Sequence, residues 1–216
     1  MECGRQPIVL IQPRMDMPQP MVDIDDQAGV KVAVAYLQKL GHRDVLWFDY
    51  PLRAFPTPAD RKQNFLSAAE EARMHGTCYH LPTWNSDVND EEMEPVIEAA
   101  MSQRLAEGRR FTAVFCYNDR LAVGAMRALR RSGLRVPEDV SVIGFDDLYG
   151  SMVIPTLTSV DTKMFDMGRA AGRMALELVM GEPEVFERLR GKREVLLPEL
   201  RVRESTGPAK PLNPAS

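Results

Sequence analysis

"FTAVFCYNDRLAVGAMRALRRSGLRVPEDVSVIGFDD", residues 111–147, contains the pattern that decides the fold. It begins with an apolar strand over 111–117 and continues with an amphipathic helix over 119–132 that ends at Gly133. A second apolar strand follows over 140–145. A strand, a helix and a strand at this spacing predict a βαβ unit, in which a right-handed crossover joins two parallel strands.

Polar residues follow both of these strands. Asn118-Asp119 comes after the first strand and Asp146-Asp147 after the second. The carboxyl ends of parallel strands share one sheet edge, where ligands bind in open α/β folds, and neighbouring strands are only about 4.8 Å apart. An amide and a carboxylate together suit a hydroxyl-rich or heteroaromatic ligand. The same residue types also cap helices and form turns, so spacing alone leaves both interpretations open.

The alternation of helices and strands extends along the chain. Helical periodicity predicts further helices over 26–40, 58–75, 90–107 and 163–180. Apolar runs predict strands over 8–11, 45–48 and 77–81, and residues 150–158 are rich in turn formers. The segment "REVLLPELRVRES" (193–205) alternates like an edge strand interrupted by Pro198, and residues 207–216 are predicted to be disordered. The predicted fold class is α/β, with parallel sheets flanked by helices.

The composition is ordinary for a globular protein. The 216 residues are 44% hydrophobic and 27% charged, and they can bury the core of one domain or of two small ones. A net charge of −4 gives no basic field for nucleic acid. No apolar run approaches the roughly 20 residues that span a bilayer, and a secretory signal is not recognisable. Because Cys3, Cys78 and Cys116 lack metal-ligand spacing, we expect a cytoplasmic protein without a metal or a cofactor.

The sequence does not favour an enzyme. His42, His75 and His80 have no nucleophile or base at a recognisable spacing, and the sequence shows no nucleophile elbow, P-loop or dinucleotide-binding turn. A hydrolase using paired carboxylates is the enzymatic alternative. Adjacent side chains such as Asp146 and Asp147 point to opposite sides of an extended chain, however, which suits a shared acid/base site poorly.

Residues 111–147 closely resemble the effector domains of LacI/GalR (lactose and galactose repressor) family transcription regulators. Three further stretches match this family in the same order: "VDIDDQAGVKVAVAYLQKLGHRDV" (22–45), "PTLTSVDTKMFDMGRAAGRMALELVMG" (155–181) and "LLPELRVREST" (196–206). The resemblance implies a periplasmic-binding-protein-like type I fold, with two α/β subdomains and a ligand cleft between them.

The resemblance also implies a division of the chain. Residues 25–158 and 193–205 are expected to form the C-terminal, effector-binding subdomain. Residues 1–24 and 162–191 are expected to form an incomplete N-terminal subdomain, without its first βα units and without a helix-turn-helix headpiece.

Four positions match ligand contacts of the family. Asn118 and Asp146 match groups that bind ligand hydroxyls or ring nitrogens in relatives, Arg61 matches a cleft arginine, and Trp84 matches an aromatic residue that stacks on the ligand. Gln12, where many members carry an aspartate, and Thr162 are weaker candidates. The alternatives are an exposed helix charge for Arg61 and a buried loop aromatic for Trp84. For Asp119 and Asp147, capping and turn formation are expected, and the bulky Tyr117 is expected to narrow the pocket.

The function implied is effector sensing in a transcription regulator. A small polar effector, such as a sugar, a sugar derivative or a purine-like molecule, would bind between the subdomains and favour one relative orientation of them. In a complete homodimeric relative, that changes the spacing of two DNA-binding headpieces. The chain itself is expected to contact neither a membrane nor, without a headpiece, operator DNA. The alternative is a stand-alone sugar-binding protein of the same fold.

Overall fold

The computed structural model describes residues 6–13, 15–50, 58–82, 90–108 and 110–211 of the chain. The chain forms two compact units. Unit 1 comprises Met1–Asp25 and Thr162–Pro198, and unit 2 comprises Asp26–Asp161 and Glu199–Ser216. The predicted α/β class, with parallel sheets and flanking helices, is confirmed in both units.

Unit 2 is built on a six-stranded sheet with the order β4-β3-β5-β6-β7-β9. The strands are β3 (Asp44–Asp49), β4 (His75–His80), β5 (Ala113–Cys116), β6 (Ser141–Phe145), β7 (Thr158–Asp161) and β9 (Glu199–Arg201). All neighbouring pairs are parallel except β7 and β9, which are antiparallel. The carboxyl ends of β3 to β7 therefore lie along one edge of the sheet.

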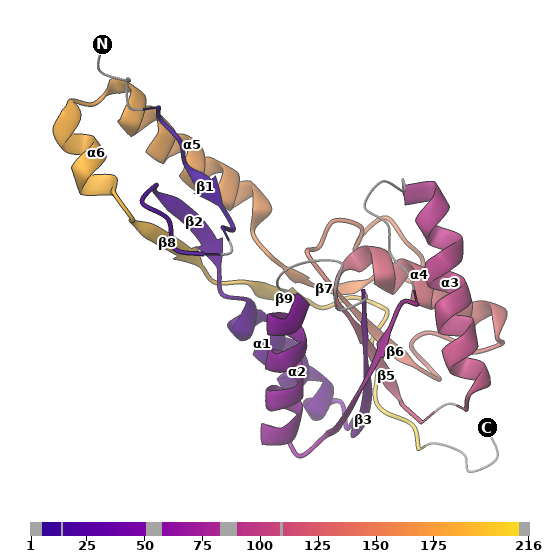
Figure 1. Cartoon of the computed structure of the whole chain (residues 1–216). Helices are drawn as coiled ribbons and strands as arrows, with labels where there is room; N and C mark the ends of the chain where they lie inside the picture. Colours follow the sequence, from indigo (N-terminus) through magenta and orange to yellow (C-terminus); the bar gives the residue numbers. More distant parts are fainter. Residues whose placement is uncertain (1–5, 14, 51–57, 83–89, 109, 212–216) are drawn as a thin grey trace. The chain divides into compact units, whose positions relative to one another are not determined.

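Helices cover both faces of this sheet (Figure 1). They are α1 (Asp26–Lys39) and α2 (Pro58–Glu71) on one face, and α3 (Asp90–Ala106) and α4 (Asp119–Arg131) on the other. Each strand supplies side chains to both faces in alternation. In β3, Leu46 and Phe48 join the core under α3 and α4, whereas Val45 and Trp47 join the core under α1 and α2. Burial on both faces explains why these strands are continuous apolar runs.

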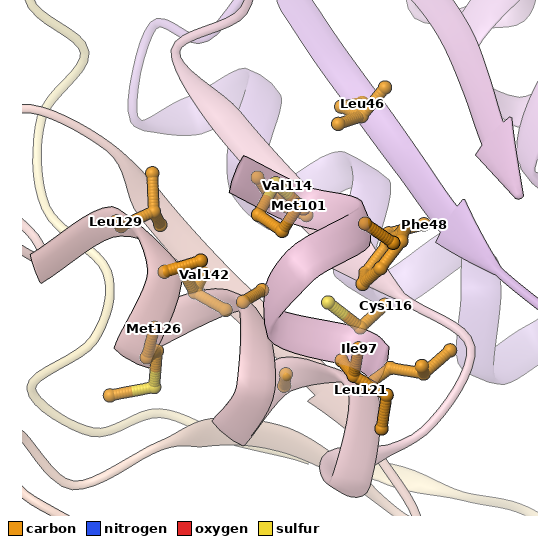
Figure 2. Close-up of a cluster of buried hydrophobic side chains, with 14 of the residues drawn as sticks. Leu46, Phe48, Ile97, Met101, Val114, Cys116, Leu121, Met126, Leu129 and Val142 are labelled. Carbon is orange, nitrogen blue, oxygen red and sulfur yellow. The ribbon is translucent and has the colours of Figure 1, made fainter. Parts of the chain in front are cut away.

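Figure 2 shows the core under α3 and α4. Ile97 and Met101 of α3 and Leu121 of α4 are fully buried and pack against alternate residues of the strands, such as Val114 and Val142. This core holds the carboxyl end of β5 against the first turn of α4. It therefore fixes the position of the polar residues that connect the two elements.

Unit 1 contains a parallel three-stranded sheet with the order β1-β2-β8. Its elements are β1 (Leu10–Ile11), β2 (Met21–Ile24), α5 (Met164–Met180), α6 (Pro183–Leu189) and β8 (Arg193–Leu196). The buried side of α5 packs on β2 through a small core: Val22, Ile24, Met167, Ala170, Ala171 and Met174. The opposite side of α5 exposes apolar side chains, including Phe165 and Met180.

The structure corrects several predicted boundaries. Residues 193–205 do not form one strand in the effector-binding unit: β8 pairs with β2 in unit 1, and β9 pairs with β7 in unit 2. The division falls at Pro198, which has no N–H group to continue a ladder. The helix predicted over 58–75 ends at Glu71, because Arg73 adopts a left-handed backbone with φ 54° and His75 begins β4.

Three elements of the structure were not predicted. They are the strand β2 over Met21–Ile24, the strand β7, which begins at Thr158 where the turn-rich stretch ends, and the helix α6, which follows Gly181. All three elements are brief, and β7 begins with hydroxyl residues instead of an apolar run. Their formation therefore depends on partners elsewhere in the chain more than on local sequence pattern.

The segment that follows β9 is anchored to the sheet of unit 2. The Val142 N–H group donates to the Ser205 carbonyl at 2.8 Å, and the Ser205 hydroxyl donates to the Val142 carbonyl at 2.6 Å. Further on, the Gly207 carbonyl lies 3.1 Å from Nε2 of the buried His42, and the Ala209 N–H group donates to a backbone carbonyl. The disorder predicted from residue 207 is therefore wrong for 207–209.

Candidate ligand-binding site

Asn118 lies at the carboxyl end of β5, where the chain enters α4. Its backbone is extended, and its Oδ1 atom accepts a hydrogen bond from the Leu121 N–H group at 3.1 Å. The capping interpretation is therefore correct for this residue. Its Nδ2 atom donates to the Tyr50 hydroxyl at 3.3 Å. Because the oxygen is committed to the helix, the capacity of this side chain to bind a ligand resides in the amide nitrogen.

Arg61 of α2 is a buried cation whose exposed fraction is only 8%. Its Nε atom donates to Asp26 Oδ1 at 2.9 Å, and Nη1 donates to the Tyr117 carbonyl at 3.1 Å. Nη1 also lies 3.6 Å from Asp146 Oδ1. The alternative of an exposed helix charge is therefore wrong. Arg61 links the amino end of α1 to the carboxyl ends of β5 and β6.

Two aromatic rings hold the Arg61 guanidinium in place. Its central carbon lies 3.9 Å from the ring centroid of Phe145 and 4.9 Å from that of Tyr117. Both distances lie within the range of cation–π attraction, which is stronger when the cation is withdrawn from water. The Tyr117 ring also packs edge-on against Tyr50, with centroids 5.7 Å apart. Aromatic residues at the ends of β5 and β6 therefore lie against the cation, and Tyr50 at the end of β3 packs against one of them.

Asp146 and Asp147 form a strained turn in which their side chains have different partners. Their φ angles are 97° and 55°, in the left-handed region that few residues other than glycine adopt. The Asp147 carboxylate accepts from Arg203 at 2.6 Å and 3.0 Å, whereas Asp146 is paired with Arg61. The predicted turn is thus present, and backbone strain of this kind is frequent at functional sites.

Opposing effects act on the pKa of Asp146. Burial raises the pKa of its carboxyl group, the Arg61 guanidinium opposes this rise, and the nearby Asp26 carboxylate adds to it. At 3.6 Å, the contact between Arg61 and Asp146 is longer than a hydrogen bond. The Asp146 oxygens therefore retain acceptor capacity for a ligand.

Asp119 has a role different from the predicted cap. Its side chain is 1% exposed, and it accepts hydrogen bonds from the Tyr149 N–H group at 3.0 Å and from the Ser159 hydroxyl. Burial raises the pKa of its carboxyl group to about 6, although these hydrogen bonds oppose the shift. Asp119 joins α4 to the loop after β6 and to β7, and thereby supports the turn that carries Asp146.

Of the other three predicted residues, one is outside the described part of the chain and two belong to unit 1. Trp84 falls outside the described residues. Gln12 and Thr162 belong to unit 1: Gln12 is exposed and has φ 48°, and Thr162 is buried. Among the described residues, the Thr162 hydroxyl has no hydrogen-bond partner. The structure therefore brings together Asn118, Asp146 and Arg61 of the six candidates, all within unit 2.

Sequence reasoning did not find two residues of the cluster, Asp26 and Tyr50. Asp26 is the first residue of α1, and Tyr50 immediately follows β3. The signal for Tyr50 was available, since it follows a parallel strand just as Asn118 does. The role of Asp26 depends on its contact with Arg61, and no local pattern indicates that contact.

Over the residues that the structure covers, no group of three or more His, Cys, Asp and Glu side chains is arranged to hold a metal ion. Nor does any helix there combine the length and apolar character needed to cross a bilayer.

Comparison with known proteins identifies the family. Residues 34–206 match the model of the periplasmic binding protein-like domain. The chain belongs to this family. Within the family, its relatives include the HTH-type transcriptional regulator reg1 of Streptomyces lividans, which is 35% identical over 195 residues, 88% of this chain and 53% of the relative. The HTH-type transcriptional regulator GalR of Escherichia coli is 34% identical over 75% of this chain and 46% of its own length.

Solved structures of the same family support this assignment. A LacI family transcriptional regulator from Enterococcus faecium, solved with bound ribose, is 25% identical with a TM-score of 0.77. The match covers 96% of this chain and 72% of that one. The predicted membership of this periplasmic-binding-protein-like chain in the LacI/GalR group is therefore confirmed. The chain spans about half the length of the curated relatives that it matches.

Proposed function

We propose that this chain is the effector-binding domain of a LacI/GalR-type transcriptional regulator, and that it binds a small polar effector, a sugar or a sugar derivative. The observation that carries the proposal is the cluster of Arg61, Asp146 and Asn118 at the carboxyl ends of β5 and β6. The ribose bound to the Enterococcus faecium relative supports a sugar as the ligand class.

The chemistry of the cluster suits a polyol. The Asn118 amide nitrogen donates, the Asp146 carboxylate accepts, and the rings of Tyr50 and Tyr117 provide apolar surface beside them. Sugar-binding sites commonly combine a few fixed polar groups with an aromatic surface. Trp84, Gln12 and Thr162 are proposed as additional contacts on the basis of the family resemblance alone.

A thermal-shift screen followed by calorimetric titration tests the ligand class. The panel contains ribose, galactose, glucose and their disaccharides, with purines as the alternative class, each added to the 216-residue chain. We expect at least one sugar to raise the melting temperature, and Asp146→Asn to abolish that shift while the variant remains folded. Stabilisation by purines alone would contradict the sugar assignment, and the absence of any shift would contradict effector binding by this chain.

We further propose that the regulator is a homodimer and that a patch on unit 2 takes part in the contact. Met152 and Ile154 are 77% and 91% exposed, beside a hollow of about 690 Å³ lined in part by Met126 and Leu134. Exposed apolar side chains grouped around a hollow are typical of protein interaction sites. We expect sedimentation equilibrium to show self-association that weakens in Met152→Lys. A monomer at all concentrations would contradict this proposal.

Operator binding and location complete the proposal. The curated relatives are named HTH-type regulators and are about twice as long as the matched region. We therefore assign operator binding to a headpiece outside these 216 residues, and we propose a cytoplasmic location. The stand-alone sugar-binding protein is the alternative. It would use the same cluster, and the named functions of the relatives favour the regulator.

A further inference from the structure

The charges at the centre of the cluster do not cancel. Arg61 is the common partner of two carboxylates, Asp26 at 2.9 Å and Asp146 at 3.6 Å. One guanidinium beside two ionised carboxylates leaves a net charge of minus one. In a partly buried site this imbalance is felt strongly by a bound ligand, because the surroundings screen charge less than bulk water does.

The surroundings of Arg61 also limit its use as an anion receptor. Its Nε atom is hydrogen-bonded to Asp26, and its Nη1 atom to the Tyr117 carbonyl. The Phe145 and Tyr117 rings lie against the guanidinium. Arginine usually binds a phosphate or a carboxylate with two parallel N–H groups. Here Asp26 already occupies one edge of that fork, so Arg61 cannot offer it fully to an anionic ligand.

The charged groups around this centre do not reverse the imbalance. Asp147 is neutralised by Arg203, with which it makes two hydrogen bonds. Burial raises the pKa of Tyr50 and Arg120, at the start of α4, opposes this rise, but Arg120 is not among the groups that shift the pKa of Asp146. The Asp49 carboxylate accepts a hydrogen bond from the Tyr50 N–H group at 2.7 Å; burial raises the pKa of Asp49, and His80 and Lys62 oppose this rise. Among the described residues, the charged groups that shift the pKa of the Asp146 carboxyl group are thus the Arg61 cation and the Asp26 carboxylate, after the larger effect of burial.

We propose that the site selects its ligand by charge: it accepts neutral or amino sugars and rejects sugar acids and sugar phosphates. Asp146 would accept from a hydroxyl or an ammonium group, while Arg61 chiefly positions Asp146 and the two rings. The inference rests on the proposed function, since it specifies the class of sugar for the same site.

The test uses matched sugars in which one neutral group of the parent is replaced by an ammonium group or by a carboxylate. Galactose, galactosamine and galacturonate form one set, and glucose, glucosamine and glucuronate form another, with glucose 6-phosphate as an additional anion. Dissociation constants are measured by calorimetry on the 216-residue chain at pH 7.5 and low salt. We expect each uronate to bind at least about tenfold more weakly than its neutral parent, from the repulsion of one like charge. The amino sugar should bind at least as tightly as the parent.

Asp26→Asn is the decisive variant. It removes one negative charge and keeps an oxygen that can accept from Arg61 Nε. The uronate penalty, which is the dissociation constant of the uronate divided by that of its neutral parent, should fall by about tenfold in this variant. Glu71→Gln is the matched control, because it removes one negative charge from the exposed end of the same helix as Arg61. Its uronate penalty should equal that of the wild type. If Asp26→Asn does not fold, the wild-type chain is titrated at a higher salt concentration instead. The difference in affinity between the amino sugar and the uronate must then become smaller.

The outcomes are distinguishable. A uronate or a sugar phosphate that binds as tightly as its neutral parent overturns the charge selection and leaves the proposed sugar-binding function standing. A penalty that neither Asp26→Asn nor salt reduces also overturns it. If no member of either set binds, the proposed function fails, and the charge selection fails with it.

Discussion

The guanidinium carbon of Arg61 lies 3.9 Å from the ring centroid of Phe145, and the same guanidinium pairs with Asp146, the next residue in the chain. Two consecutive residues at the end of β6 therefore engage one buried cation, the first through its ring and the second through its carboxylate. A turn with positive φ at Asp146 allows both contacts, because it reverses the direction in which the second side chain points.

This arrangement predicts that Arg61 stabilises the fold as well as the site. Arg61→Ala should lower the free energy of unfolding by about 3 kcal/mol, because it leaves the Asp26 and Asp146 carboxylates without their cation. The control is Arg131→Ala, which removes a largely exposed arginine paired with Glu98 and should cost less than about 1 kcal/mol. Urea unfolding of both variants provides the measurement. Equal costs would show that the Arg61 cluster contributes no more than a surface ion pair.

The backbone at Asp146 predicts an order among substitutions. Asp146→Ala should be about 1 kcal/mol less stable than Asp146→Asn, because φ 97° suits asparagine better than alanine. Asp146→Gly should relieve the strain and be at least as stable as the asparagine variant. Thermal unfolding ranks the three proteins. If alanine is tolerated as well as glycine, the positive φ is not a property of the folded chain in solution.

The raised pKa of Asp119 predicts a pH dependence of stability. Its carboxyl group has a pKa of about 6 in the folded chain, against an ordinary value of 3.8. Between these two values the folded chain binds more protons than the unfolded chain, so the contribution of Asp119 to stability falls as the pH rises through 6. From pH 5 to pH 7.5 this loss should be about 1.4 kcal/mol.

Asp119→Asn removes this titration while keeping a side chain that can bond both Tyr149 and Ser159. The stability of the wild type relative to this variant should therefore be greater at pH 5 than at pH 7.5. Because Asp49 and Asp146 titrate in both proteins, the comparison isolates Asp119. Urea titrations at the two pH values measure it. A difference that does not change with pH would mean that Asp119 ionises normally.

The close approach of α4 to β6 predicts that Gly144 cannot be replaced. A methyl group on Gly144 would overlap the Asp119 carboxylate and the Leu157 side chain. Gly144→Ala should therefore lower the free energy of unfolding by about 2 kcal/mol. Gly172→Ala is the control, since nothing lies within 4 Å of the added carbon and alanine favours helices. This second substitution should be neutral or stabilising in the same unfolding assay.

The βαβ segment formed by β5, α4 and β6 was predictable from the sequence, because each pattern that indicates it lies within a short stretch of the chain. The apolar runs over 111–117 and 140–145 form buried strands, Gly133 follows the helix, and Asn118 caps it. The family resemblance then identified Asp146 and Arg61 as members of one site. The structure places these two residues in contact, while their role in ligand binding stays a prediction.

Features that depend on distant partners were not predictable from the sequence. The burial of Arg61 requires Asp26 from another helix and two rings from other strands. Thr158 and Ser159 form a buried strand because their polar groups bond to Ser205 and Asp119. No local sequence pattern indicates either set of contacts. The sequence around Arg61 therefore resembled that of an exposed helix charge, and the sequence at the start of β7 resembled a turn.

The anchoring of Gly207 beside His42 joins residues 165 positions apart in the chain. During synthesis, strands β3 to β7 of this sheet are made well before β9 and the segment that follows it, so His42 and Ser141 bond to Gly207 only after nearly all of unit 2 has been synthesised. Contacts over such a separation slow folding, and partly closed intermediates expose surface on which other chains can aggregate. The demand on chaperones should therefore be greatest while residues 199–209 are still being made, and a fusion joined immediately behind Ala209 would disturb the last step of closure.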